Sequence, residues 1–153
     1  MSIEILNESG ADVSIKELSS LSRFVMDRMR VHPLAELCIK AVDESTIAQL
    51  NAQWMDKEGP TDVLAFPMDE LRPGLVTEEP EEGVLGDLVL SPSVAERQGV
   101  EAGHGREGEI DLLTVHGILH LLGYDHAEPE EHAVMFGLQD ELLGKWRSTP
   151  EPS

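Results

Sequence analysis

The sequence contains one cysteine, few cations and no long apolar run, and each shortage excludes a class of protein. Cys38 has no partner with which to form a disulfide, so the chain is not a disulfide-stapled secreted domain. Residues 1–10 lack the basic stretch and apolar run of an export signal, and no segment reaches the roughly 18 continuous apolar residues of a membrane span. We therefore expect a soluble, cytoplasmic protein without a membrane partner, in which Cys38 is a small core residue rather than a nucleophile.

Basic residues are scarce as well. Eleven Lys and Arg stand against 30 Asp and Glu, which gives a formal net charge of -19. This charge disfavours indiscriminate binding to polyanions, so any nucleic-acid surface must be local. One weak basic stripe is present, because Lys16, Arg23 and Arg30 recur every seven residues and would share one face of a helix. Solvation of that face is the simpler interpretation, and contact with a ligand is the alternative.

The apolar pattern predicts a single α/β domain over residues 1–147, followed by a disordered tail over 148–153. The acidic segment 77–82 is expected to be unstructured, and no repeat or long linker divides the chain. Short apolar runs predict strands at about 3–6, 37–42, 63–66 and 84–90. Helical spacing and start signals predict helices at about 18–29, 45–54, 92–102, 107–122 and 129–146.

Three histidines lie close together in the segment HGILHLLGYDH, residues 116–126. Apolar residues point in almost every direction around the axis of residues 110–122, which predicts a helix buried on most sides. His116 and His120 are four residues apart, so their imidazoles stack on one face of that helix. Buried imidazoles need hydrogen-bond or metal partners to offset the loss of hydration.

Gly123 is placed to end the helix in a left-handed turn, which would bring His126 back towards the first two histidines. Three neutral imidazoles that converge in this way make the ligand set of a catalytic zinc, with the fourth position left for water. For each histidine taken alone, a satisfied core or surface residue is the alternative interpretation.

The spacing has the H-x-x-x-H-x-x-G-x-x-H frame of the metzincin zinc peptidases, but Gly117 stands where those enzymes carry the glutamate general base. The chain resembles much more closely the YbeY family of endoribonucleases, the ribosomal RNA maturation factors. Three blocks carry this resemblance in family order, and their spacing extends it over nearly the whole chain. The blocks are HGILHLLGYDH at 116–126, GPTDVLAFP at 59–67 and LGDLVLS at 85–91.

The resemblance implies a mixed four-stranded sheet flanked by about five helices, with a metzincin-like metal helix. It implies one zinc per chain, held by His116, His120 and His126, and metal-dependent cleavage of single-stranded RNA. The implied partners are ribosomal RNA and the ribosome or its small subunit. The implied roles are trimming of small-subunit ribosomal RNA, notably at its 3′ end, and ribosome quality control.

Two departures from the family pattern concern the substrate side. Trp54-Met55-Asp56 stands where many members carry an arginine, and Ala65 stands where the family has a serine. If that arginine grips phosphate, Lys57 is the candidate to replace it. Met135 matches a recurrent family methionine, which lies either beneath the metal or in the ordinary core.

The general base is not fixed by the motif. Asp125 adjoins a predicted ligand and is the candidate to orient a histidine or accept a proton, while Asp62 and Asp87 are candidates to support the ligands. The alternative is that Asp125 caps the turn after Gly123 and that Asp62 caps the start of a strand. Attack by water and attack by the ribose 2′-hydroxyl both stay open.

Two other functions remain possible at this level. One is a metzincin-like metallopeptidase whose general base is displaced, which Gly117 disfavours. The other is a non-catalytic zinc-containing ribosome-assembly factor. A structural zinc usually has four protein ligands, and the spare candidates His104, His132 and Cys38 lack convincing spacing.

Overall fold

The computed structural model describes residues 2–32, 34–68, 83–125 and 127–148. Within these ranges no helix combines the length and the apolar character needed to cross a membrane. The predicted acidic segment 77–82 lies outside the described residues.

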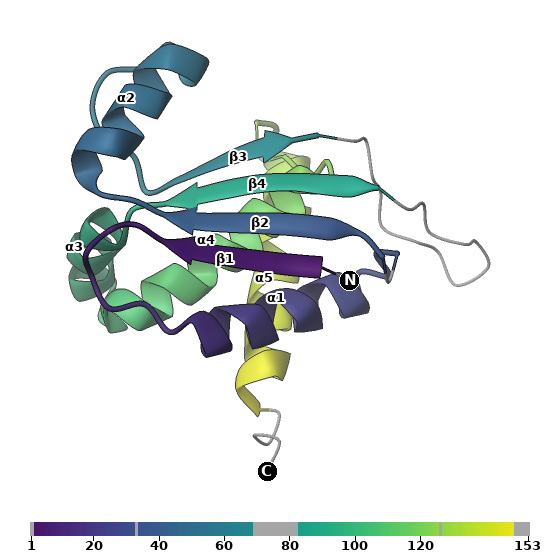
Figure 1. Ribbon diagram of the computed structural model, residues 1–153. Coiled ribbons are helices and arrows are strands. Elements are labelled where there is room, and N and C mark those ends of the chain that lie inside the picture. Colours follow the sequence, from purple (N-terminus) through teal and green to yellow (C-terminus); the bar gives the residue numbers. More distant parts are fainter. Residues whose placement is uncertain (1, 33, 69–82, 126, 149–153) are drawn as a thin grey trace.

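A four-stranded sheet forms the centre of the domain (Figure 1). Its strands are β1 (Ser2–Asn7), β2 (Glu36–Ala41), β3 (Val63–Pro67) and β4 (Val84–Leu90), and they lie in the order β1-β2-β4-β3. β1, β2 and β4 are parallel, whereas β3 runs antiparallel to β4. The sheet is therefore mixed, as the family resemblance implied.

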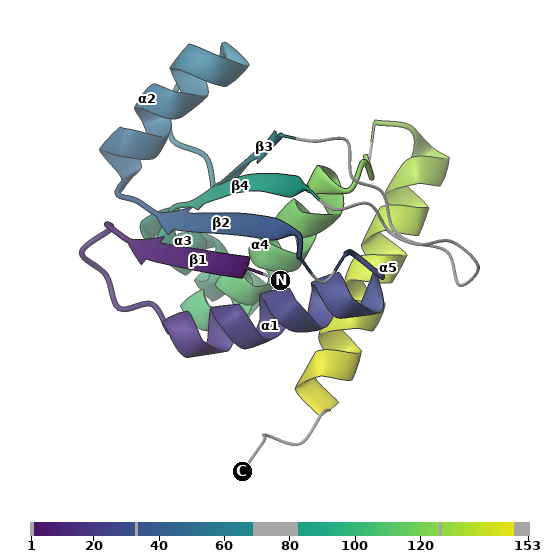
Figure 2. The same cartoon turned by 45° about the vertical axis from the view of Figure 1, so that its right-hand side comes forward.

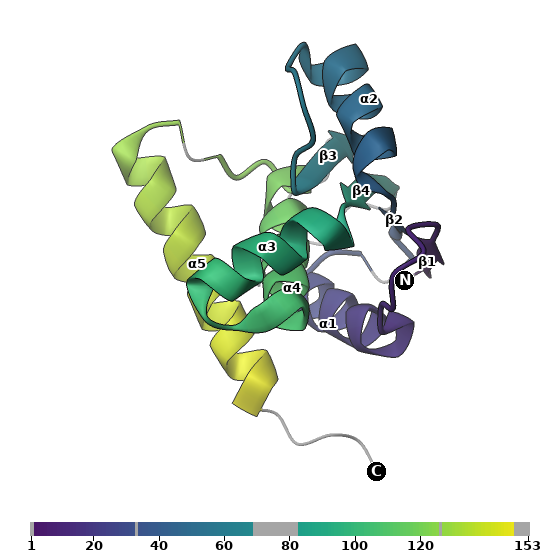
Figure 3. The ribbon, with the colours of Figure 1, turned by 90° about the vertical axis from the view of Figure 1, so that its left-hand side faces the viewer.

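In the part of the chain that the structure describes, five helices pack around the sheet: α1 (Ile15–Arg28), α2 (Glu44–Met55), α3 (Pro92–Ala102), α4 (Gly105–Leu121) and α5 (Pro129–Ser148). Figure 3 shows α1, α3, α4 and α5 on one side of the sheet. Figures 1 and 2 show α2 projecting from the domain near β3. The predicted α/β class and number of helices are confirmed.

Helix starts follow from local capping. The side chains of Ser14, Asp43 and Ser91 accept hydrogen bonds from backbone N–H groups in the first turns of α1, α2 and α3. Such caps satisfy backbone donors that have no partner within the helix. Pro92 in the first turn of α3 suits the same position, because proline has no N–H to leave unbonded.

The main core lies between the sheet and the helices that cover this one face. α4 runs through it and is buried on most sides, as its apolar pattern predicted. Its buried apolar side chains are Ile110, Leu113, Val115, Ile118, Leu119 and Leu121. A smaller cluster beneath α2 contains Val42, Ile47, Leu64 and Val89, with Leu50 and Phe66 packed against it. This cluster holds the base of α2 on the opposite face of the sheet.

Two predictions at the ends of helices were wrong. α1 ends at Arg28, and Arg30 follows it with a left-handed φ of 55°. Arg30 therefore does not share a helix face with Lys16 and Arg23, which removes one member of the basic stripe. Ser148, predicted as the start of the tail, is the last residue of α5. The remaining tail, 149–153, lies outside the described residues.

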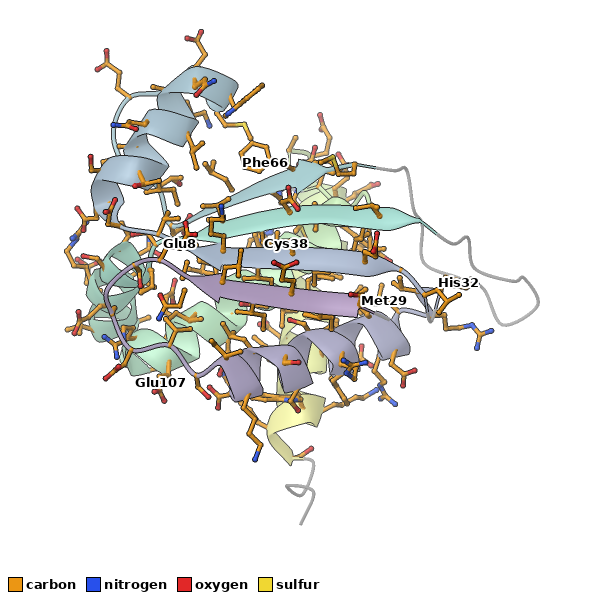
Figure 4. All side chains as sticks on the ribbon, viewed as in Figure 1. Glu8, Met29, His32, Cys38, Phe66 and Glu107 are labelled. Carbon is orange, nitrogen blue, oxygen red and sulfur yellow. The ribbon has the colours of Figure 1, made fainter. Side chains whose placement is uncertain are left out.

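Cys38 was predicted in the core, and the structure places it half-buried on the open face of the sheet (Figure 4). Because side chains alternate along a strand, Leu37 and Ile39 face the core while Cys38 faces the other way. Burial, with Asp87 and Glu4 nearby, raises the pKa of the Cys38 thiol. The neutral thiol is favoured, which agrees with the prediction that Cys38 is no nucleophile.

Candidate functional site

Two of the three predicted metal ligands lie together on the last two turns of α4. The ring centroids of His116 and His120 are 5.3 Å apart, and their planes meet edge to face at 76°. Both side chains are half-buried rather than fully buried. The helix spacing therefore brings two imidazoles together at a place that solvent and a ligand can reach.

His116 is held from the neighbouring helix α5. Its Nδ1 lies 3.0 Å from Oε1 of Gln139, a side chain that is only 2% exposed. With the carbonyl oxygen as acceptor, the imidazole donates from Nδ1 and carries its lone pair on Nε2. Sequence reasoning missed Gln139. The available signal was a glutamine on the same face of the predicted helix as the apolar Met135 and Leu143.

Aromatic contacts extend from His116 along α5. The ring of Phe136 lies 5.6 Å from that of His116 at 57°, and it stacks on His132 at 4.1 Å and 11°. The ring of Phe136 therefore contacts those of both His116 and His132. Met135 is fully buried in the main core, which supports the ordinary core interpretation of this methionine.

The turn after α4 has the predicted left-handed geometry. Gly123 has a φ of 100°, and its N–H donates to the carbonyl of His120 at 3.0 Å. The N–H of Tyr124 donates to the carbonyl of Leu119 at 3.1 Å. Together these two bonds make a Schellman cap, which closes the helix and redirects the chain.

The third predicted ligand, His126, lies outside the described residues. Its return towards His116 and His120 therefore stays a prediction. Among the residues that the structure describes, no group of three or more His, Cys, Asp or Glu side chains is arranged to hold a metal. The two described imidazoles nevertheless fit the donor chemistry of zinc, because neutral histidine nitrogen is one of its common ligands.

Asp125, the candidate base, lies exposed on the turn beyond Gly123. It borders a hollow whose lining residues are Gly123, Tyr124, Asp125, Glu130, Glu131 and Val134. The exposure of Asp125 leaves its carboxylate accessible to a substrate. Its role as a base stays a prediction.

Gly117 faces the sheet. A Cβ atom built there would come 2.7 Å from Cδ2 and 3.1 Å from Cδ1 of Leu88, a fully buried side chain of β4. A glutamate at this position would therefore begin inside the core. The close approach explains why this helix carries glycine where the metzincin peptidases have their base.

Asp62 caps the start of β3 with its side-chain carboxylate. Its Oδ1 accepts a hydrogen bond from the N–H of Val63 at 2.7 Å and one from the hydroxyl of Thr61 at 3.3 Å. These contacts support the capping interpretation of Asp62. In the amide orientation that satisfies its surroundings, Gln98 of α3 donates to the other Asp62 oxygen at 3.1 Å and to Glu109 of α4 at 2.9 Å.

His104, Cys38 and Asp87 lie away from the histidine pair. Nε2 of His104 lies 2.6 Å from Oε1 of Glu109, near the opposite end of α4. Asp87 pairs in register with Cys38, on the sheet face opposite to Leu88 and α4. The interpretation of Asp87 as a support for the ligands is therefore wrong, and His104 and Cys38 do not supply a fourth ligand.

Of the two substrate-side departures, Trp54-Met55-Asp56 lies at the end of α2, whereas Ala65 lies within β3. Trp54 is 62% exposed and Met55 is 37% exposed, so the residues at the family arginine position form an apolar surface. Lys57 follows in an exposed loop, where its N–H donates to the carbonyl of Asn51 at 3.3 Å. The Asn51 side chain also donates to the carbonyl of Gly59 at 3.0 Å, which fastens this loop to the helix.

Comparisons with known proteins agree with the sequence motifs. The sequence profile of the family described as Endoribonuclease YbeY matches residues 4–147. A protein from Nocardioides sp. named Endoribonuclease YbeY is 82% identical over 148 residues, which cover 97% of this chain and 99% of that protein. A protein of the same name from Thermobifida fusca is 57% identical over 151 residues, which cover 99% and 97% of the two chains.

The fold comparison points the same way. The solution structure of TM1509 from Thermotoga maritima matches with a TM-score of 0.58 and 28% identity, covering 97% of this chain and 93% of that one. The profile match and the two relatives each cover nearly the whole length of the chain. This protein belongs to the endoribonuclease YbeY family.

Proposed function

We propose that this protein is a zinc-dependent endoribonuclease that cleaves single-stranded RNA in the maturation of ribosomal RNA. Membership of the family makes it a hydrolase that acts on RNA and uses a metal. The finer parts of the proposal are zinc as the metal, the 3′ end of small-subunit ribosomal RNA as the substrate, and a part in ribosome quality control. The ribosome or its small subunit is the proposed partner, and the cytoplasm the proposed location.

The observation that carries the proposal is the pair formed by His116 and His120, with the His116 ring held by Gln139. A ring that donates from Nδ1 to a fixed acceptor has its other nitrogen available in the form that binds a metal. His126 is the proposed third ligand. If bound there by the three imidazoles, zinc would lower the pKa of a water molecule and polarise a phosphate oxygen.

The rest of the chemistry is assigned to side chains of this chain. Asp125 is the proposed base, which accepts a proton on a carboxylate oxygen as the attacking oxygen bonds to phosphorus. The P–O bond to the leaving ribose oxygen breaks, and that oxygen takes up a proton from solvent. Lys57 is the proposed phosphate contact, since its loop follows the segment where family members carry arginine. Gln139 keeps the His116 ring in place, and the packing of α4 on the sheet fixes the backbone that carries both rings.

The peptidase alternative has less support. Gly117 lies against Leu88, so the position next to the first histidine has no space for a base. The assembly-factor alternative requires a fourth protein ligand. His104 is bonded to Glu109 near the other end of α4, and the ring of the exposed His132 stacks on Phe136. The endoribonuclease proposal takes its base from Asp125 and needs no fourth protein ligand.

The test uses metal-loaded protein with labelled single-stranded RNA and, in parallel, an unstructured polypeptide, each with and without a chelator. We expect chelator-sensitive cleavage of the RNA alone, restored by added zinc. Cleavage of the polypeptide alone would favour the peptidase, and cleavage of neither would favour the assembly factor. RNA carrying an unprocessed small-subunit 3′ end, compared with an unrelated single strand and a duplex of equal length, tests the proposed substrate.

A further inference from the structure

We propose that Gln139 is the positioning residue of the candidate metal site, because it fixes His116 in the tautomer that presents Nε2 as the metal-binding nitrogen. The inference rests on the proposed function only for its metal-binding part. The tautomer itself is a property of the metal-free protein, so it can be measured whether or not zinc binds.

Gln139 is a buried side chain that holds His116 through a hydrogen bond. The side chain projects from α5 into the interface with α4, where it is 2% exposed. Its Oε1 lies 3.0 Å from Nδ1 of His116. A buried amide oxygen that loses its hydrogen-bond partner is destabilising, so this bond selects against any state of His116 that cannot donate from Nδ1.

The chemistry of the contact then decides the proton position. A neutral imidazole has one donor and one acceptor nitrogen, and the hydrogen bond at one nitrogen determines the state of the other. Donation from Nδ1 to Gln139 places the lone pair on Nε2. In the other tautomer, the lone pair of Nδ1 would face the Gln139 oxygen, and the two acceptors would repel.

Neighbouring rings restrict rotation of the imidazole. Phe136 lies 5.6 Å from the His116 ring on the α5 side, and His120 meets it edge to face at 5.3 Å. A flip of the ring about the Cβ–Cγ bond would replace Nδ1 by Cδ2 opposite Gln139, and it would have to move through these contacts. Gln139 therefore selects the tautomer, while Phe136 and His120 hold the plane of the ring.

Three variants separate this role from simple packing. Gln139→Met removes the acceptor and keeps the length of the side chain, whereas Gln139→Glu keeps an acceptor oxygen at the same place. Gln98→Met is the matched control, because Gln98 bonds to Glu109 and Asp62 rather than to His116. Far-UV circular dichroism and thermal unfolding establish that each variant is folded.

The first measurement is the ¹⁵N chemical shift of the His116 ring nitrogens in metal-free protein, at about pH 8, where an ordinary histidine is neutral. We expect a protonated Nδ1 and an unprotonated Nε2 in the wild type, Gln139→Glu and Gln98→Met. In Gln139→Met we expect a substantial fraction with the proton on Nε2. The second measurement is zinc affinity by competition with a chromophoric chelator, with a loss of about 10–100-fold in Gln139→Met alone.

Several outcomes would overturn the inference. A wild-type ring protonated on Nε2 would do so even if Gln139→Met failed to fold, and so would an unchanged tautomer and affinity in Gln139→Met. An equal loss of zinc in Gln98→Met would show general loosening of the helices instead of positioning. If the wild type bound no zinc yet showed the expected tautomer, the metal of the proposed function would be wrong while the role of Gln139 in the tautomer stood.

Discussion

Gly117 of α4 lies directly against Leu88 of β4, so closely that a Cβ atom at position 117 would come within 2.7 Å of Leu88 Cδ2. Successive residues of a helix point about 100° apart. His116 and Gly117 therefore face different surroundings although they are adjacent in sequence. One side of the helix meets α5 through His116 and Gln139, and another closes on the sheet through Gly117.

This contact predicts a difference between two glycine-to-alanine substitutions. Gly137 of α5 has open space where a Cβ would lie, so Gly137→Ala should stabilise the protein by about 0.5–1 kcal/mol. Gly117→Ala gains the same helical preference but overpacks against Leu88, which costs about 1–3 kcal/mol. Chemical denaturation of both variants should place Gly117→Ala below Gly137→Ala by that overpacking term. Equal stability would mean that Leu88 yields without cost.

The second prediction concerns zinc content. We expect one zinc per chain in the wild type and a large loss in each of His116→Ala, His120→Ala and His126→Ala, since a site with two ligands binds metal far more weakly. His104→Ala is the control, because His104 is bonded to Glu109 near the other end of α4. Elemental analysis of purified protein gives the answer. A variant with undiminished zinc removes that histidine from the ligand set.

The third prediction follows from Asp111 of α4, which is 6% exposed and whose Oδ1 has no hydrogen-bond partner among the described residues. Burial is the main cause that raises the pKa of Asp111 to about 7, with Glu17 and Glu107 adding to it and Arg147 opposing it. The folded protein then binds more protons than the unfolded chain between the ordinary Asp pKa of about 4 and about pH 7. The free energy of unfolding should fall as the pH rises through that window and level off above it.

Asp111→Asn removes this loss of stability at high pH. Relative to the wild type, the variant should gain about 1–3 kcal/mol between about pH 5 and pH 8, since one pKa unit equals about 1.4 kcal/mol and residual solvent screens part of the effect. Urea unfolding at both pH values measures the gain. Asp140→Asn serves as control, because Asp140 is exposed. If the free energies of unfolding of wild type and Asp111→Asn changed in parallel with pH, the raised pKa of Asp111 would be contradicted.

The fourth prediction tests the proposed base. Asp125→Asn keeps the shape of the side chain and removes its basicity, so kcat for RNA cleavage should fall by about 10²–10⁴ with zinc content unchanged. Glu131→Gln is the matched control, because Glu131 borders the same hollow. A wild-type rate in Asp125→Asn would leave Asp125 with the turn-capping role alone.

The fifth prediction concerns salt and RNA affinity. With only 11 cations in the chain, the slope of log affinity against log salt should be shallower than about -4, the value for six phosphates of a single strand. Lys57→Ala should weaken binding and reduce the slope by about one phosphate contact. The Lys16/Arg23/Arg30 triple alanine variant is the comparison. A larger effect in that triple variant would place the RNA path along α1 instead.

The sequence predicted those features that depend on local patterns. Short apolar runs gave the strands, and the apolar residues all around 110–122 predicted that α4 is buried. Gly123 predicted the left-handed end of α4, because few other residues adopt that conformation. The four-residue spacing predicted that His116 and His120 lie side by side, because one helix brings residues four apart together.

The features that the sequence failed to predict depend on contacts between distant segments, on which face of the sheet the helices cover, or on an uncommon backbone conformation. Gln139 meets His116 only because α5 folds back on α4, and periodicity does not say which helices touch. Cys38 lies in an apolar run typical of a parallel strand buried on both faces. Four helices cover one face of this sheet, and on the other face α2 packs against Leu64 and Val89 and leaves Cys38 half-buried. Arg30 adopts a left-handed conformation that is rare for residues other than glycine, so the sequence did not predict that the helix ends before it.

The order of the strands also sets an order of events during synthesis. β4 lies between β2 and β3 in the sheet, although it follows both in the chain. A ribosome releases the N-terminal residues first, so β2 and β3 emerge before the strand that joins them. Sheets that depend on such distant pairing form slowly, and unpaired strand edges invite aggregation in the meantime. In the nascent chain, the edges of β2 and β3 that pair with β4 therefore stay unpaired until Val84–Leu90 has left the ribosome.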